Sequence, residues 1–206
     1  MPRPFTAVLT TLTLAFLTAC GGGHDHDHDH GSGSFNVFGE VSKAVCVLSP
    51  TDNSELKDVA GTVTFTRIKS GVLVQAEVTG LKPNAKHGLH IHEWGDISAN
   101  DGSATGDHYD PMGIDAHGLP QAHSHGEEVH HMTGGHAGAL GNLETDDQGN
   151  ASYSLVFENL SLTEGNALLG RAVIIRLNED TGEQPDGNAG PPVAQGVIGI
   201  ANPEAD

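Results

Sequence analysis

Alternating apolar and polar residues mark short stretches in the first half of the chain. Residues 62–66 read TVTFT, and residues 72–79 alternate in the same way before a turn at residues 80–84. A period of two places successive side chains on opposite faces of a strand. This pattern, together with the β-branched and small residues of 41–48, predicts strands over residues 41–48, 59–68 and 72–79.

More strand-like stretches continue to the C-terminal end. They lie at residues 87–94, 151–157, 172–177 and 196–200, and the DDQGN sequence at 146–150 favours a hairpin turn after residues 140–143. Short, turn-bounded and non-helical segments are typical of antiparallel sandwiches and barrels. We therefore expect a single all-β domain.

Residues 96–137 break this pattern. They are rich in glycine, aspartate and histidine and have almost no apolar periodicity. A loop of this length in a small domain is usually functional or disordered. We expect this segment to be ordered, because metal ligation by its histidines can stabilise it in place of an apolar core.

Histidine is the unusual component of the chain. Ten of the 14 histidines lie between His87 and His136. His90 and His92 are two apart in a predicted strand, so their rings share one face, whereas His87 is expected on the opposite face. Neutral imidazole is a common ligand of copper and zinc. The pair, with His108, His117 and His136 in the loop, predicts a metal centre.

The N-terminal 19 residues predict a signal peptide. The apolar run from Phe5 to Leu17 follows Arg3 and is too short to cross a membrane. It ends in the sequence LTAC at residues 17–20, which resembles a bacterial lipobox, so we expect cleavage before Cys20 and lipid on Cys20. The alternative is an ordinary secretory signal with an incidental cysteine. Either way the protein is expected to leave the cytoplasm, for the periplasm or the cell surface.

Residues 20–38 predict a flexible tether. Glycine and serine flank an HDHDHDH tract, in which the histidines are His24, His26, His28 and His30. Alternating imidazole and carboxylate groups can chelate metal without a fixed fold, and a solvated spacer is the alternative. The folded domain is expected over residues 39–202, with a short tail at 203–206.

The net charge limits the classes of partner, and the number of cysteines limits how the domain can be stabilised. A formal net charge of -18 argues against a nucleic-acid partner and fits a well-solvated surface. The chain has two cysteines. If Cys20 carries lipid, Cys46 has no partner within the chain, and we expect it to be a buried small residue rather than a reactive thiol. The domain is then held by its core and by metal.

Several of these segments resemble the copper/zinc superoxide dismutases, in the family's order. The matching pieces are Lys43–Leu48, His87–Asp96, Gly106–Pro111, Leu140–Asn142, Gly170-Arg171, Gly187–Gly190 and Gly196–Ala201. The resemblance implies an eight-stranded Greek-key β-barrel with the metal site outside it, under two long loops. It also implies copper and zinc as cofactors, and an antioxidant reaction that converts superoxide to oxygen and hydrogen peroxide.

The resemblance implies roles for individual residues. In the family copper takes four histidines, and His90, His92 and His108 match the first three, with His108 bridging to zinc. Zinc takes that bridge, two more histidines, matched by His117 and His136, and an aspartate. Asp180 matches an aspartate that links the two sites through hydrogen bonds to their histidines.

The departures from the family pattern concern the same sites. Arg176 stands at the fourth copper histidine, and Ala139 stands at the zinc aspartate. Gln195 replaces one disulfide cysteine, and residues 97–105 contain no other. Pro192 replaces the arginine that orients superoxide. Because arginine stays protonated and offers no lone pair to a metal, we expect dismutation to be weak or lost.

Two alternatives stay open at this point. One is an active dismutase with a rearranged copper site, in which a loop histidine replaces the missing ligand or Arg176 attracts superoxide to copper. The other is a periplasmic metal scavenger or delivery protein that uses the histidine tract. The insertion adds His123, His125, His130 and His131, which complete the zinc site, hold extra ions or are simply solvated. The sequence leaves open the metal bound in the cell, the choice of membrane, and whether the chain forms a homodimer.

Overall fold

The computed structural model describes residues 41–52, 54–113, 121–124, 130–133, 136–183 and 186–202, with 121–124 and 130–133 described by their backbone. The chain divides into two units, Met1–Val37 and Phe38–Asp206, and every described residue belongs to the second. The predicted signal peptide, Cys20 and the histidine tract lie outside the described residues. Within the described ranges, no helix is both long and apolar enough to cross a bilayer.

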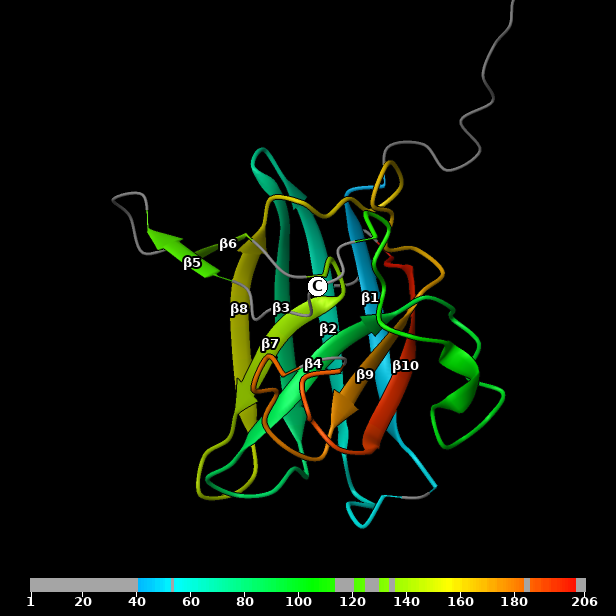
Figure 1. Ribbon diagram of the computed structural model, residues 1–206, viewed down its shortest axis with the longest axis vertical. Coiled ribbons are helices and arrows are strands. Elements are labelled where there is room, and N and C mark those ends of the chain that lie inside the picture. The colour runs from blue at the N-terminus through cyan, green and yellow to red at the C-terminus, as the bar shows by residue number, and fades with distance from the viewer. Residues whose placement is uncertain are drawn as a thin grey trace, which may run out of the picture. The chain divides into compact units, whose positions relative to one another are not determined.

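Eight antiparallel strands form a nearly closed barrel (Figure 1), which confirms the predicted all-β fold. They lie in the order β8-β3-β2-β1-β10-β9-β4-β7. The Tyr153 hydroxyl donates to the Leu140 carbonyl, which joins the two end strands, β8 and β7. The strands are β1 Lys43–Pro50, β2 Ala60–Ile68, β3 Gly71–Thr79, β4 Lys86–His92, β7 Ala139–Glu144, β8 Ala151–Phe157, β9 Ala172–Arg176 and β10 Pro192–Ile200.

The core follows the predicted alternation. In β3, Val72, Val74, Ala76 and Val78 are buried while the residues between them are more exposed. Cys46 of β1 is fully buried, as expected for a small apolar residue, and burial raises the pKa of its thiol to about 12. The apolar interior leaves the polar chemistry to the ends of β4 and β9 and to the loops that follow them.

The long segment 96–137 contains regular structure, so its interpretation as a loop throughout was wrong. A short 3-10 helix spans Ser103–Thr105, and a hairpin is formed by β5 (Gln121–Ser124) and β6 (His130–Thr133). β6 runs parallel to β8 at the edge of the sheet (Figure 1). An edge strand presents unpaired backbone groups, and a polar segment can satisfy them without contributing apolar residues. Apolar periodicity therefore gave no sign of this hairpin.

Candidate metal centre

Backbone hydrogen bonds bring three segments together at the end of β4. The Ile91 amide donates to the Gly138 carbonyl over 2.8 Å, the Tyr109 amide to the Ile91 carbonyl over 2.9 Å, and the Gly138 amide to the Tyr109 carbonyl over 2.8 Å. A Cβ at Gly138 would lie 2.3 Å from the Ile91 oxygen, so the approach requires glycine. An isolated bridge pairs His92 with His108. We call this arrangement of Ile91, Tyr109 and Gly138 the three-segment junction.

The junction gathers three of the predicted ligands. Ring nitrogens of His90, His92 and His108 all lie within 4.8 Å of one another, and all three side chains are buried. The ring centroids of His90 and His108 are 4.1 Å apart, and those of His108 and His136 are 6.4 Å apart. Three convergent imidazoles suit copper or zinc. We call His90, His92 and His108 the three-histidine cluster.

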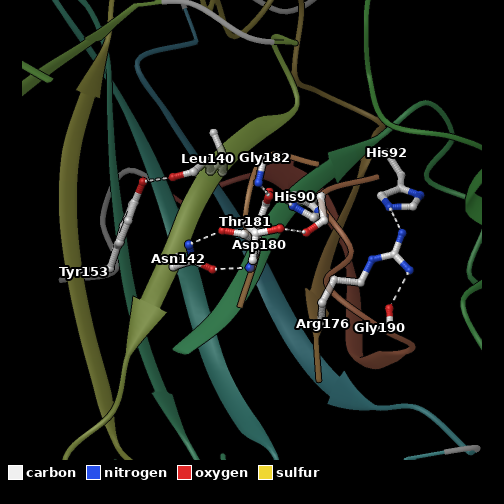
Figure 2. A network of polar contacts seen from close by, with 11 residues as sticks. His90, His92, Leu140, Asn142, Tyr153, Arg176, Asp180, Thr181, Gly182 and Gly190 are labelled. Atoms are coloured by element: carbon white, nitrogen blue, oxygen red, sulfur yellow. Dashed lines mark hydrogen bonds and ion pairs between the residues drawn. The ribbon is translucent and has the colours of Figure 1, made fainter. Parts of the chain in front are cut away.

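Asp180 orients the first of these rings. Its Oδ2 lies 2.7 Å from His90 Nε2, and the Gly182 amide donates to its Oδ1 over 2.8 Å. Asn142 holds Asp180 by two further bonds, donating to its carbonyl over 2.9 Å and accepting from its amide over 2.7 Å (Figure 2). When Nε2–H donates to the carboxylate, the Nδ1 lone pair of His90 is left for a metal. The predicted second link of Asp180, to a zinc histidine, stays a prediction, since His117 lies outside the described residues.

His92 is held in the opposite tautomer. Its Nδ1 donates to the Gly106 carbonyl over 2.8 Å and lies 3.0 Å from the Thr105 hydroxyl, which leaves the lone pair on Nε2. Burial, reinforced by the charge of Arg176, lowers the pKa of His92 to about 3. The ring is therefore neutral near pH 7, which is the form that binds metals.

Arg176 lies beside the cluster, at the end of β9. Its Nη2 is 3.4 Å from His92 Nε2 and its Nη1 donates to the Gly190 carbonyl over 3.2 Å (Figure 2). Burial lowers the pKa of Arg176, and the carboxylates of Asp186 and Asp180 oppose this shift. A cavity of about 460 Å³ opens here, lined by His92, Gly106, Asp107, His108, His136, Arg176 and Asp186.

The other departures from the family pattern occupy ordinary structural roles. Ala139 is buried at the start of β7, where its amide donates to the His136 carbonyl. The Gln195 Nε2 donates to the Ala99 carbonyl over 3.1 Å, so a hydrogen bond connects β10 to the 96–106 segment. The Pro192 carbonyl accepts a 2.8 Å hydrogen bond from the Thr51 hydroxyl.

The remaining predicted histidines fall in three groups. His117 and His125 lie outside the described residues, like the tract at 24–30. His123, His130 and His131 belong by their backbone to the β5–β6 hairpin, where His123 pairs with His131. His87 is buried, and its Nδ1 lies 2.8 Å from the Arg176 carbonyl. His87 is outside the three-histidine cluster, as its strand face predicted.

Two residues near the centre were not singled out from the sequence. The Arg171 guanidinium carbon lies 3.4 Å from the centre of the Tyr109 ring, and its Nη1 donates to the Glu93 carbonyl over 2.8 Å. It thereby ties the segment after His108 to the end of β4. Asp110 Oδ2 lies 3.8 Å from His136 Nε2. A signal was available for Asp110, because it follows His108 at the same spacing of two that relates His90 to His92.

Comparison with known proteins agrees with this geometry. The family model for copper/zinc superoxide dismutase matches residues 59–198. The superoxide dismutase [Cu-Zn] of Cordyceps militaris is 37% identical over 169 residues, which cover 78% of this chain and 99% of that protein. A crystal structure of the clock protein EA4 matches with a TM-score of 0.63 at 34% identity, over 78% of this chain and 95% of that one. The chain therefore belongs to the copper/zinc superoxide dismutase family.

Proposed function

We propose that this protein is an exported, lipid-anchored member of the family that binds copper or zinc and dismutates superoxide weakly or not at all. The three-histidine cluster would hold one ion, and His136 with His117 would contribute to a second. Bound copper would supply one-electron redox chemistry. The three-histidine cluster and the family membership support metal binding.

One observation carries the proposed loss of activity, namely the guanidinium of Arg176 at 3.4 Å from His92 Nε2. A guanidinium only donates hydrogen bonds, so it competes with a metal for the lone pair of that nitrogen. Its positive charge also opposes a cation bound by the same ring. Arg176 therefore weakens metal binding by the cluster, whereas a fourth imidazole at this position would strengthen it.

The surrounding charge supports the same proposal. Superoxide is an anion, and a cationic surface is what would concentrate it at the metal. The chain has a formal net charge of -18 and contains no lysine or arginine after Arg176. Two of the residues that line the cavity, Asp107 and Asp186, are acidic and exposed.

Exchange of the arginine tests the proposal. We expect Arg176→His to raise the dismutation rate per bound copper by about tenfold or more, since it removes the charge and adds a donor. Arg67→His is the control, because Arg67 lies on β2 and donates to the Thr163 hydroxyl. A wild-type rate close to that of ordinary family members would refute the proposal.

An active enzyme is the second candidate, favoured by the single cationic group that lines the described part of the cavity. If Arg176 attracts superoxide to copper held by three histidines, Arg176→His leaves the rate unchanged or lowers it. The same set of proteins therefore separates the two candidates. The copper content of each protein is measured alongside the rate, which distinguishes a difference in turnover from a difference in copper loading.

The N-terminal segment supports the proposed anchor and a role in metal capture. We expect Cys20→Ser to release the protein from the membrane fraction, whereas Cys46→Ser leaves it there. Deletion of residues 24–30 is expected to lower metal loading when metal is scarce. Equal loading with and without the tract would exclude the tract from metal capture.

A further inference from the structure

We infer that Asp110 supplies the carboxylate for a second metal ion, held together with His108 and His136. The family resemblance assigns this carboxylate to position 139, where the chain has alanine. The inference rests on the metal binding proposed above and adds a ligand that the family pattern does not provide.

The position of Asp110 is suited to this role. Its Oδ2 lies 3.8 Å from His136 Nε2, and the two side chains are 19% and 13% exposed. The distance exceeds the range of an N–H···O hydrogen bond. Zinc–nitrogen and zinc–oxygen bonds of about 2 Å allow two donors of one ion to lie up to about 4 Å apart. The gap between the two groups therefore suits an ion better than a direct bond.

The second oxygen of the same carboxylate points to the same conclusion. Asp110 Oδ1 is buried and has no hydrogen-bond partner within the described part of the chain. A buried carboxylate oxygen without a partner is unfavourable, because nothing replaces the water that it has lost. A bound cation provides that compensation. Asp110 thus has one oxygen near an imidazole and another that lacks a donor.

His108 connects this position to the three-histidine cluster. Its ring centroid is 4.1 Å from that of His90 and 6.4 Å from that of His136. An imidazole has two nitrogens, so one ring can serve an ion on each side. The Ala139 amide donates to the His136 carbonyl over 2.9 Å. The methyl side chain of Ala139 has no lone pair and cannot bind a metal.

Cobalt(II) tests the inference, because its visible absorption reports its ligands. The background is the full-length chain with His24, His26, His28 and His30 changed to serine, so that the tract cannot bind the probe. One equivalent of copper(I), which absorbs no visible light, first fills the three-histidine cluster under anaerobic conditions. Cobalt(II) is then titrated, and zinc(II) is used to displace it.

We expect Asp110→Asn to lower the cobalt and zinc affinities by at least about tenfold and to change the cobalt spectrum. Asp107→Asn is the matched control, since Asp107 lines the cavity beside His108 and His136, is exposed and loses the same charge. It is expected to change the affinities by less than about twofold, because solvent screens an exposed charge. Thermal unfolding of the metal-free variants verifies that both are folded.

Each of the following results would overturn the inference. The affinity of Asp110→Asn could equal that of the background protein, or Asp107→Asn could lower it just as much. A weaker affinity with an unchanged cobalt spectrum would make Asp110 a residue that positions His136 and not a ligand. If the background protein binds copper but no cobalt, the inference fails while the proposed function stands. If it binds neither metal, both fail.

Discussion

At the scale of single residues, a hydrogen-bond partner fixes the ring orientation of His90 and of His92. Asp180 fixes His90 through a 2.7 Å contact, and Asn142 in turn fixes Asp180 from two sides. Mutation of such partners typically lowers metal affinity by about 10- to 100-fold. This support for His90 does not involve Arg176, which contacts His92 instead.

Neutralising Asp180 should weaken metal binding. We expect Asp180→Asn to lower copper affinity by about 10- to 100-fold, because the amide holds the His90 ring less firmly in the required tautomer. The measurement is competition with a chelator of known affinity. Asp147→Asn, at an exposed position in the turn before β8, controls for the lost charge. Unchanged affinity in Asp180→Asn would show that His90 does not need this partner.

The sequence predicted some site residues and could not predict others, for physical reasons. The spacing of His90 and His92 places them on one strand face, so it needs no tertiary information. The spacing of Asp110 from His108 was a local signal, but the approach of Asp110 to His136, 26 residues later in the chain, depends on tertiary structure. Arg176 was visible as a departure, but its contact with His92 required the register between β9 and β4.

At the scale of elements, the three-segment junction holds the loops to the barrel. Its tight point is Gly138, where a Cβ would lie 2.3 Å from the Ile91 oxygen and 2.8 Å from the Tyr109 nitrogen. Because all the close atoms belong to backbone, a side chain there cannot be accommodated by a rotamer change. The strand and the loop segments must separate instead.

Gly138→Ala should therefore destabilise the protein and its metal site together. We expect a loss of about 1–3 kcal/mol in the free energy of unfolding, together with weaker copper binding, as overpacking displaces His108 and His136. Urea unfolding of the metal-free protein and a copper titration measure the two effects. Gly199→Ala is the control, since the nearest atom to its Cβ would be 3.9 Å away. Equal stability of the two variants would contradict the junction's role.

A second connection between elements is a side-chain hydrogen bond from β10 to the 96–106 segment. Gln195 of β10 is buried, and its side chain donates to the Ala99 carbonyl. We expect Gln195→Ala to lower the free energy of unfolding by about 1 kcal/mol, since it removes one hydrogen bond to the Ala99 carbonyl, which still accepts from the Gly102 amide. Gln148→Ala, in an exposed turn, should have no measurable effect in the same urea experiment. Similar curves for both variants would mean that the 96–106 segment is held by other contacts.

Prediction of the elements succeeded where one strand face is buried. Val72 to Val78 alternates because every second side chain enters the core, and the predicted and observed limits of β3 differ by one residue. The β5–β6 hairpin has no such requirement, since it is fixed by backbone pairing at the sheet edge. Its formation depends on where β8 ends in space, which the local sequence does not contain.

At the scale of the whole molecule, folding is coupled to proton binding through His92. Its pKa of about 3 in the folded state lies below the ordinary value of 6.5, so the unfolded chain takes up a proton first as the pH falls. The stability that this group contributes is complete above about pH 6.5 and declines as the pH falls towards 3.

Metal-free protein should therefore lose stability on mild acidification. One histidine contributes at most about 1.4 kcal/mol per pH unit within this window. Urea unfolding at several values between pH 7.5 and 5 measures the slope, and His92→Gln should flatten it. An identical slope in wild type and His92→Gln would assign the acid sensitivity to other groups.

The burial of Cys46 gives the barrel a chemical reporter of its own opening. In a Cys20→Ser variant it is the only thiol in the chain, because the sequence has two cysteines. A thiol with a pKa of about 12 carries almost no thiolate at neutral pH. An alkylating reagent therefore reacts with Cys46 only after the strands around it have separated and exposed the thiol. The labelling rate then measures how often β1 separates from its neighbours β2 and β10, and slower labelling after metal is added measures how much the bound ion stabilises the closed barrel.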